Sequence, residues 1–471
     1  MLSGVLSPRS APSRDPQPAR SDAPTRGPGS VRRWMRSPAR LITAGTAMIL
    51  TAGTAALMMP FTRIGEHAPP LVDALFTAAS ALCVTGLITV DTATYWSPAG
   101  QLVIMVLIQI GGLGVMTLST LLAVLTVRRI GVRTRAAIAQ SSAGTLQDAP
   151  AIIGRILAIS FAVEAVIAAV LVVRYLLDGM SAGTALFRGA FLAVSAFNNA
   201  GFALDSDSLI GENSDPFILA PVMVAVVLGG IGFPVIVEML RRFRTPRRWS
   251  LTTKLTLTGT AVLLGAGTVL TLALESSNSA TLGSMSWGDR LWNAVFHSVV
   301  SRTAGFNAID TSAMRPESWL GTDVLMMIGG GSGGTAGGMK VTTVMVLLLI
   351  IRSELRGDPF VVAFGKRLSR AVHREVITVV GLMGALVAVS TFVVMVLESI
   401  PFDRVLFEVT SALSTTGLST GITADLSPVS KILLVGLMII GRVGPITLGT
   451  ALALRRRPLL FEPPKERPTI G

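Results

Sequence analysis

The stretch that decides the fold is FTAASALCVTGL, residues 76–87. In it, a short apolar run ends with the polar turn Val84-Thr85-Gly86-Leu87, and three further short apolar runs end in the same way. The other turns read Asn199-Ala200-Gly201-Phe202, Thr303-Ala304-Gly305-Phe306 and Thr415-Thr416-Gly417-Leu418. Their glycines recur after 115, 104 and 112 residues (86 to 201, 201 to 305 and 305 to 417), which predicts four internal repeats.

The residues upstream of these turns repeat as well. A serine lies six positions before the glycine in three of them (Ser80, Ser195 and Ser411), and a phenylalanine lies ten before (Phe76, Phe191 and Phe407). A lone glycine in an apolar segment usually marks close helix packing. Four glycines in matching surroundings instead indicate a shared structural element.

Composition places the chain in a membrane. Of the 471 residues 51% are hydrophobic and 14% charged, with a mean hydropathy of +0.65. An ordinary soluble enzyme would have about 25% charged residues, and a disordered chain would lack the apolar content. Long uncharged runs of about 20 residues suit a hydrocarbon layer of ~30 Å. We expect an all-α polytopic protein with about eight spans, near 41–60, 100–127, 151–177, 216–240, 253–274, 318–351, 376–398 and 429–454.

Each pair of spans encloses a shorter apolar run, too short to cross a membrane and suited to a re-entrant half-helix. These runs are 71–83, 184–197, 287–301 and 403–414. The unit is therefore span, half-helix, span, around one pseudo-fourfold pore. We divide the chain into a basic tail (1–40), four pore repeats (41–128, 150–242, 252–351 and 370–457) and a short C-terminal tail (458–471).

Basic residues predict the topology. The tail 1–40 is rich in proline and arginine, a composition that predicts disorder. With segments 128–135, 241–254, 352–374 and 455–467 it holds 29 of the 40 Lys and Arg residues, which predicts that both termini are cytoplasmic. The net charge of +13 then reflects basic loops and not nucleic-acid binding. The opposite face carries acids that would concentrate cations: Asp91, Asp205, Asp207, Asp310 and Asp425.

The turns suggest what the pore does. Non-helical backbone at membrane depth is tolerated where its carbonyls line a water-filled path. Glycine permits positive φ, and a half-helix that ends at the turn directs its negative dipole end there. Four such turns around one axis would form a ring of carbonyls that replaces the hydration shell of a cation. Asn199 departs from its counterparts Val84, Thr303 and Thr415, and either adds a side-chain ligand or braces the turn.

Glycines also gather in the second span of each repeat. They read Gly111-Gly112-Leu113-Gly114, Gly229-Gly230-Ile231-Gly232 and Gly441-Arg442-Val443-Gly444, and the third repeat extends them over 329–338. So many glycines oppose a helix, which predicts a flexible loop that breaks the third span below the turns and plugs the pore. The residues Gly338-Met339-Lys340 do not make a phosphate-binding loop, because no strand precedes them and Met339 intervenes.

Charged residues inside spans usually face a cavity. Arg442 stands where the first two repeats have Gly112 and Gly230, and either forms an electrostatic barrier or tethers the glycine-rich loop. Glu164 we interpret as a structural partner of a polar neighbour. One cysteine, Cys83, and three scattered histidines exclude a disulfide and disfavour a metal centre. Nothing indicates an enzyme.

These features together resemble the Trk/Ktr/HKT superfamily of potassium transporters, and the eight spans are most similar to the Ktr-type membrane subunit. The resemblance covers about 41–457. It implies potassium uptake across the plasma membrane through a selectivity filter, with no bound cofactor, and gating by the glycine-rich loop with Lys340 and Arg442. The implied filter residues are Val84, Thr85, Gly86, Asn199, Ala200, Gly201, Thr303, Ala304, Gly305, Thr415, Thr416 and Gly417, and the implied gating residues are Gly329, Gly330, Gly331, Ser332, Gly333, Gly334, Thr335, Gly337, Gly338, Lys340 and Arg442.

The resemblance also implies a homodimer in the lipid bilayer on a cytosolic ring of nucleotide-binding regulatory subunits, and it allows sodium as an activator. The alternative is a secondary transporter of a small solute or a sodium-coupled cation symporter. Broken helices of inverted repeats are typical of secondary transporters. An even number of spans per repeat, which gives all four repeats one orientation, disfavours that class.

Overall fold

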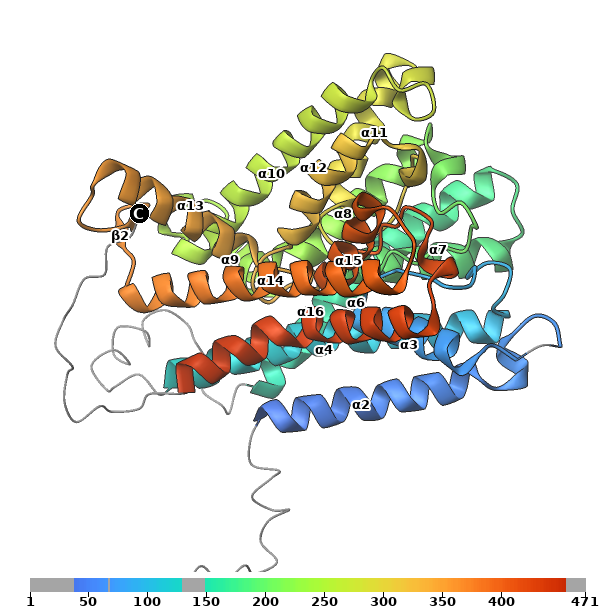
Figure 1. Ribbon diagram of the computed structural model, residues 1–471, viewed down its shortest axis with the longest axis horizontal. Coiled ribbons are helices and arrows are strands. Elements are labelled where there is room, and N and C mark those ends of the chain that lie inside the picture. The colour runs from blue at the N-terminus through green and yellow to red at the C-terminus, as the bar shows by residue number, and fades with distance from the viewer. Residues whose placement is uncertain (1–37, 67, 129–148, 455–471) are drawn as a thin grey trace, which may run out of the picture. The chain divides into compact units, whose positions relative to one another are not determined.

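The computed structural model describes residues 38–66, 68–128 and 149–454, and the structural statements below concern these residues (Figure 1). The chain divides after Thr46 into two units, Met1–Thr46 and Ala47–Gly471. Of the first unit, the described part is the opening of helix α2 (Pro38–Leu57). Apart from 38–40, the tails predicted over 1–40 and 458–471 lie outside the described residues.

Helices dominate the second unit, as expected. Its long helices are α4 (Pro98–Arg128), α6 (Ala149–Leu177), α10 (Leu251–Glu275), α14 (Arg370–Leu397) and α16 (Pro428–Leu454). Two pairs of shorter helices take the place of long ones. α8 (Pro216–Ile231) and α9 (Phe233–Arg242) are separated by one residue, whereas α12 (Pro316–Met327) and α13 (Val341–Arg356) are separated by residues 328–340. The described residues also include the antiparallel hairpin β1 (Val362–Ala363) and β2 (Lys366–Arg367), and the 3-10 turns η1 (Pro60–Thr62), η3 (Ile210–Glu212), η4 (Pro246–Arg248), η5 (Leu282–Ser284), η6 (Thr311–Ala313) and η7 (Thr423–Asp425).

Four short helices occupy the positions predicted for the half-helices. They are α3 (Leu71–Cys83), α7 (Ala182–Asn198), α11 (Trp287–Val300) and α15 (Phe402–Ser414). Each ends directly before, or within two residues of, its glycine-containing turn. The ends are deeply packed, and residues 76–87 and 407–418 are buried without interruption. The prediction of short helices that end in buried turns is confirmed.

Local sequence explains where many of these helices begin. The helix that follows each turn starts with a proline, at Pro98, Pro216, Pro316 and Pro428. Proline suits the first helical position because its φ is already helical and its missing N–H would have no intrahelical partner there. Hydroxyl N-caps start α7 and α11, where Ser181 and Ser286 accept hydrogen bonds from backbone N–H groups in the first turn.

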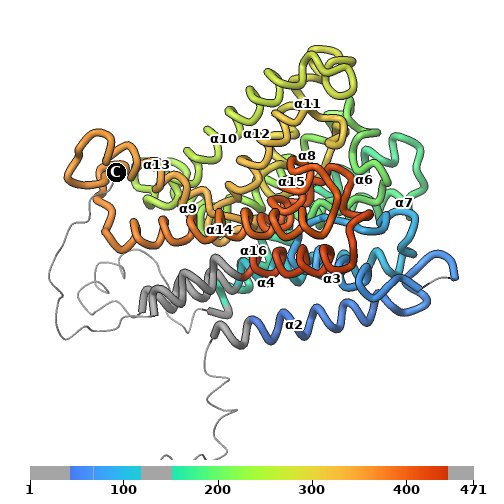
Figure 2. Tube along the Cα trace, viewed as in Figure 1, coloured from blue at the N-terminus to red at the C-terminus, as the bar shows by residue number. Residues whose placement is uncertain are grey.

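The short helices are arranged in a closed circle. Each contacts the helix that follows the preceding turn: α7 contacts α4, α11 contacts α8 and α15 contacts α12. The circle is completed by α3, which contacts α16, the helix that follows the last turn (Figure 2). The first and last quarters of the chain are therefore neighbours, and the four turns are drawn toward one place.

One predicted span differs from the structure, and another is broken as predicted. By length and composition, α4, α6, α10 and α14 can cross a membrane, and the pair α8 and α9 adds a fifth span if it is counted as one. The expected continuous span over 216–240 is wrong, because it bends by 98° at Gly232, where α8 ends. The expected span over 318–351 is divided by a loop between α12 and α13, as its glycines predicted.

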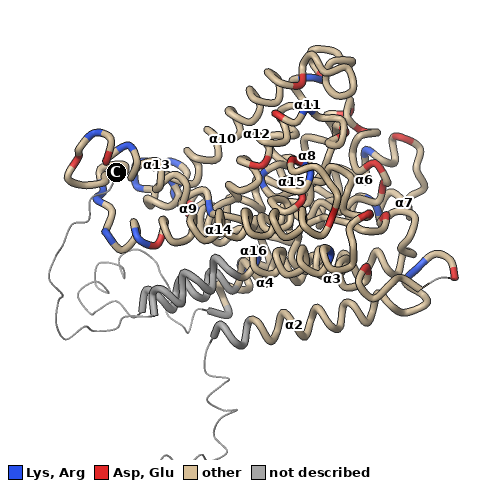
Figure 3. Tube along the Cα trace, viewed as in Figure 1, with Lys and Arg blue, Asp and Glu red and all other residues tan. Residues whose placement is uncertain are grey.

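Charge is segregated along the second unit. Lys and Arg gather around α9, α13, the β1–β2 hairpin and the start of α14, whereas Asp and Glu are frequent in the loops beside α6, α7, α10 and α11 (Figure 3). These two groups correspond to the basic and acidic segments that the sequence assigned to opposite sides of the membrane.

Candidate functional site

The four turns share one backbone conformation. We name them turn 1 (84–86), turn 2 (199–201), turn 3 (303–305) and turn 4 (415–417). Each begins with a residue in the left-handed region, with φ between 52° and 69°, and ends with a glycine of φ between 72° and 99°. Residues other than glycine rarely adopt positive φ, and clusters of such residues mark sites where structure constrains the backbone. The repetition at all four turns indicates one element built four times.

The four glycines form a closed ring, which we call the glycine ring. An ideal Cβ atom on Gly86 would lie 3.0 Å from the Cα atom of Gly201, one on Gly201 would lie 3.0 Å from that of Gly305, and one on Gly305 would lie 3.0 Å from that of Gly417. A Cβ atom on Gly417 would return to within 3.0 Å of the Cα atom of Gly86. The prediction that four turns distant in sequence lie together is therefore confirmed.

Backbone carbonyls crowd the same ring. The carbonyl oxygens of Thr85, Ala200, Ala304 and Thr416 each lie within 2.8 Å of where the Cβ atom of a neighbouring glycine would stand. These are the residues directly before the four glycines. A side chain on any glycine would therefore collide with a peptide oxygen, which explains the requirement for glycine at this step.

Serine side chains hold two of the turns. Ser80 Oγ accepts a hydrogen bond of 3.0 Å from the N–H of Gly86, and Ser411 Oγ accepts one of 3.0 Å from the N–H of Gly417. The hydroxyls of Thr85, Thr303 and Thr416 are buried and have no hydrogen-bond partner among the described residues. Nearly all buried polar atoms in folded proteins have a hydrogen-bond partner, so these three hydroxyls beside the ring are exceptional.

The segment 329–340, which we call the glycine loop, lies against these turns. An ideal Cβ atom on Gly337 would be 2.0 Å from Thr415 Oγ1 in turn 4. Thr335 Oγ1 donates a hydrogen bond of 2.9 Å to Asn199 Oδ1 in turn 2. The loop is almost entirely buried, with Ser332 and Lys340 partly exposed. It was predicted to lie below the turns, and it contacts two of them directly.

The loop also explains the unexpected break at Gly232. Gly331 N–H and Thr335 N–H donate to the carbonyls of Gly230 and Gly229 at 2.8 Å and 3.1 Å, respectively. Phe233 N–H in turn donates to Gly333 O at 3.3 Å. The end of α8 thus exchanges its helical hydrogen bonds for bonds to the loop, and Gly232 turns the chain with φ 96°. A longer continuous helix would leave the loop amides unpaired.

Two basic side chains secure the loop. Lys340 Nζ donates 2.6 Å to Ala336 O within the loop. Arg442 on α16 donates to Thr335 O, and its Nη2 donates 3.2 Å to Gly111 O on α4. Arg442 is 5% exposed. The sequence left two roles open for Arg442. Its hydrogen bonds favour a tether that holds the glycine loop, and its buried positive charge is also compatible with an electrostatic barrier to cations.

Three of the second-span glycines serve close packing. Ideal Cβ atoms on Gly111, Gly229 and Gly441 would lie 1.8–1.9 Å from carbonyl oxygens of Leu82, Phe197 and Leu413. Each of these carbonyls is four residues before a ring glycine. The glycines therefore let each following helix approach the end of its own short helix, which is the packing role usual for glycine in membrane helices.

Sequence reasoning overlooked several buried polar residues around the turns. Arg302 directly precedes turn 3, is 8% exposed and places Nη2 3.4 Å from Gly329 O at the start of the glycine loop. Glu408 on α15 accepts 2.9 Å from Thr420 N–H and 2.8 Å from Thr423 Oγ1, and so anchors the chain after turn 4. Neither residue stands out in the sequence, because the same two short runs carry other charged residues, such as Arg290 and Asp403.

Glu164 has the structural partners that we predicted. Gln109 Nε2 donates to both of its carboxylate oxygens at 3.0 Å, and Asn198 Nδ2 donates to Oε1 at 3.2 Å. Asn198 is the last residue of α7, directly before turn 2. The carboxylate on α6 therefore supports this turn from behind.

The acidic residues that follow the turns are partly engaged in loop structure. Asp91 accepts hydrogen bonds from Ala93 N–H, Thr94 Oγ1 and Ser206 Oγ, the last of which links the loops after turns 1 and 2. Partial burial would raise the pKa of Asp91, but these hydrogen bonds lower it below its ordinary value. Asp205 pairs with Arg188. Asp91 therefore stays negatively charged, whereas the charge of Asp205 is offset by Arg188.

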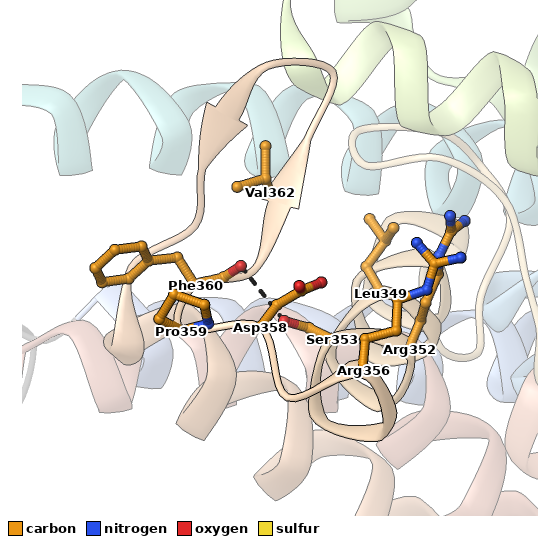
Figure 4. A pocket seen from close by; sticks show the side chains of 8 residues that line it. All are labelled: Leu349, Arg352, Ser353, Arg356, Asp358, Pro359, Phe360 and Val362. Carbon is orange, nitrogen blue, oxygen red and sulfur yellow. Dashed lines mark hydrogen bonds between the residues drawn. The ribbon is translucent and has the colours of Figure 1, made fainter.

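Other candidate sites lie away from the turns or are absent. Among the described residues, no group of three or more His, Cys, Asp or Glu side chains is placed to hold a metal ion. A surface pocket of about 470 Å³ lies between the end of α13 and the β1–β2 hairpin, lined by Arg352, Arg356 and Asp358, with Ser353 Oγ bonded to Phe360 O at its base (Figure 4). It shares no residue with the glycine ring or the glycine loop.

Comparison with known proteins agrees with this arrangement. The chain is 37% identical over 424 residues to the Ktr system potassium uptake protein B of Bacillus subtilis, covering 88% of this chain and 93% of the relative. It is 36% identical over 443 residues to the potassium/sodium uptake protein NtpJ of Enterococcus hirae, covering 92% and 97%. The crystal structure of the potassium transporter TrkH from Vibrio parahaemolyticus has the same fold, with a TM-score of 0.68 at 20% identity over 88% of this chain and 84% of that one.

A family model described as TrkH, cation transport protein, matches residues 36–456. This range includes all four turns, the glycine loop and Arg442. The chain belongs to the TrkH family of cation transport proteins.

Proposed function

We propose that this chain takes up potassium ions across the plasma membrane through a pore at the glycine ring. The observation that carries the proposal is the closure of the ring, in which four segments about 100 residues apart present the carbonyls before Gly86, Gly201, Gly305 and Gly417 at one place. Carbonyl oxygens arranged in this way can replace the hydration shell of a monovalent cation. The relatives named for potassium uptake support the choice of ion.

We assign the selectivity filter to turns 1 to 4 and propose that their backbone carbonyls are the ion ligands. The short helices end at these turns, so their negative dipole ends add to the attraction for a cation. Buried, unpartnered hydroxyls such as Thr85 Oγ1 provide further oxygens nearby. Each turn contributes one glycine, so the coordinated stretch is short.

We propose that the glycine loop is the gate. Its burial against turns 2 and 4 and its hydrogen bonds to the end of α8 support a closed position that obstructs the path below the filter. Lys340 and Arg442 hold it there. Movement of the loop would exchange a limited number of backbone hydrogen bonds, each worth about 0.5–1.5 kcal/mol net, so a partner of moderate affinity can open it.

The remaining assignments follow the family resemblance. We propose that the chain forms a homodimer and that a cytosolic ring of nucleotide-binding regulatory subunits opens the gate. The basic ends of α9 and α13 support a cytoplasmic position for that face (Figure 3), and the basic segments of the sequence support the same position for both termini. The membrane potential supplies ~2.3 kcal/mol per charge for each 100 mV, so uptake needs no catalytic activity or bound cofactor. Sodium is a candidate activator.

Uptake of rubidium-86, a potassium substitute, tests the function in cells that lack their own potassium uptake. We expect the chain, expressed with a regulatory subunit, to restore uptake, and potassium to compete more strongly than sodium. Gly86→Ser and Gly305→Ser introduce side chains into the ring and should weaken the preference for potassium. Gly265→Ser on α10 is a matched control because no atom lies within 4 Å of its Cβ position. An unchanged ion preference in both ring variants would exclude the filter assignment.

A further inference from the structure

Thr335 is the residue of the glycine loop with the most connections to other parts of the chain. Its N–H donates 3.1 Å to Gly229 O at the end of α8, and its carbonyl accepts from Arg442 on α16. Its hydroxyl donates 2.9 Å to Asn199 Oδ1 in turn 2. Thr335 is 0% exposed, so each of these bonds is shielded from water.

Asn199 is a distinctive residue among the four turns. It opens turn 2 in the left-handed conformation, as Val84, Thr303 and Thr415 open theirs. Val84 has no polar side-chain atom, and the hydroxyls of Thr303 and Thr415 have no hydrogen-bond partner among the described residues. Within the described chain, turn 2 is therefore the turn whose first side chain is hydrogen-bonded to the glycine loop. Of the two roles that the sequence left open for Asn199, this contact favours bracing of the turn.

Movement of the Asn199 side chain acts on turn 2 because the backbone of this residue is part of the turn. The Asn199 N–H holds that backbone by donating a hydrogen bond of 3.1 Å to Ala196 O. Asn199 is 1% exposed while the loop is in place, and withdrawal of the loop would break its bond to Thr335. The amide would then exchange this partner for another, and because its backbone is part of turn 2, the turn would adjust with it. Coupling between two sites acts equally in both directions.

From this juxtaposition we propose that the Asn199–Thr335 hydrogen bond couples the position of the glycine loop to the geometry of turn 2. Thr335 and Asn199 are positioning residues: opening of the gate alters the ion preference of the filter, and ion occupancy of the filter alters the tendency of the gate to open. The inference rests on the proposed function, since it needs turn 2 to be part of the filter and the loop to be the gate.

Four variants and a control test the coupling in the rubidium-86 assay, with sodium as competitor. Thr335→Val removes the hydroxyl and keeps the shape, Thr335→Ser keeps the hydroxyl, and Asn199→Val copies the residue that Val84 shows to fit this backbone. The fourth variant is the double substitution. Thr271→Val is the control, because it removes another buried threonine hydroxyl, one that donates 2.9 Å to Gly267 O within α10 and contacts neither the glycine ring nor the glycine loop.

We expect Thr335→Val and Asn199→Val each to change both uptake and the rubidium-to-sodium preference about fivefold, the equivalent of one buried hydrogen bond. The double variant should match either single variant, Thr335→Ser should stay within about twofold of the unsubstituted chain, and Thr271→Val should be unchanged. Membrane abundance and melting temperature in detergent monitor folding. If the Thr335→Val protein does not accumulate in the membrane, the test depends on the other two single variants. The ion preference should then change in Asn199→Val and stay nearly unchanged in Thr335→Ser.

Additive effects in the double variant, or a changed uptake with an unchanged ion preference in both single variants, would overturn the coupling while leaving the transport function intact. Absence of any cation uptake by the unsubstituted chain with its regulatory subunit would instead overturn the proposed function. The two failures are therefore distinguishable in one set of measurements.

Discussion

Substitution of each ring glycine by alanine should reduce ion selectivity in an order that the structure predicts. An ideal Cβ atom would lie 2.1 Å from the nearest carbonyl oxygen at Gly417, 2.3 Å at Gly305, 2.5 Å at Gly86 and 2.8 Å at Gly201. Contacts below 3.0 Å force a displacement, and every colliding atom here is backbone. The required displacement is therefore largest at Gly417 and smallest at Gly201.

The magnitude has two parts. Positive φ costs a residue with a Cβ atom about 1–2 kcal/mol at any of the four positions. The displacement of the neighbouring carbonyl adds to this and differs among them, and it acts directly on the proposed ion ligands. We expect the rubidium-to-sodium preference to fall most in Gly417→Ala, then in Gly305→Ala and Gly86→Ala, and least in Gly201→Ala.

Competition between rubidium-86 and sodium measures the preference, and melting temperature in detergent measures stability. Gly436→Ala is the control, since no atom lies within 4 Å of its Cβ position on α16 and alanine favours a helix. Equal losses at all four ring positions would show that backbone conformation alone decides the effect. A normal preference in Gly417→Ala would refute the reasoning that the ring coordinates ions.

Three further predictions concern the surroundings of the ring. Arg442→Ala should raise rubidium-86 uptake at least tenfold, because it removes two hydrogen bonds from a charged donor, each worth about 1.5–3 kcal/mol. Arg241→Ala, at an exposed position, is its control. Unchanged uptake of Arg442→Ala at equal expression would contradict the tether. Glu164→Leu should lower the free energy of unfolding by about 1–3 kcal/mol by leaving buried amide donors unpaired, whereas a melting temperature equal to that of the unsubstituted chain would exclude the supporting role. Burial alone would raise the pKa of Glu398, but hydrogen bonds from the start of α16 lower it below its ordinary value of 4.5, so the stability that they add is present above that value and is lost as the pH falls through the lowered pKa. The difference in melting temperature between the unsubstituted chain and Glu398→Gln should therefore shrink on acidification below about pH 4.5, and a constant difference would contradict this assignment.

Much of the architecture could be predicted because its signals are local and repeated. The half-helix predicted over 71–83 agrees with α3 at both ends, and the glycine-rich stretch breaks the third inner span as expected. Both depend on residues that are neighbours in sequence. The recurring prolines that start α4, α8, α12 and α16 were a further local signal that could have fixed the starts of these helices.

The break at Gly232 could not be predicted from local sequence. Gly229-Gly230-Ile231-Gly232 closely matches Gly111-Gly112-Leu113-Gly114, yet α4 continues as a helix and α8 ends. The difference arises from the glycine loop, about 100 residues downstream, which donates hydrogen bonds to the carbonyls of Gly229 and Gly230. The local glycine content allows either a continuous helix or a break, and contacts with the glycine loop decide for the break in α8.

The side-chain contacts of the site were also beyond sequence reasoning. The alternatives for Asn199 and for Arg442 depend on which atoms face them, and both face Thr335, a residue with no conspicuous signal of its own. Arg302 shows the same limitation, since its approach to the start of the loop joins residues 27 positions apart on different elements.

The contacts of the glycine loop make the four quarters of this molecule unequal. The loop comes from the third quarter and is packed against turns from the second and fourth. An assembly of four identical subunits would carry four such loops, all competing for a volume that accommodates one. Fusion of the quarters in a single polypeptide lets one of them evolve an obstruction, another an arginine to hold it and a third an asparagine to bind it. The proposed filter, which is nearly symmetric, and the proposed gate, which is present once, can thus share one chain.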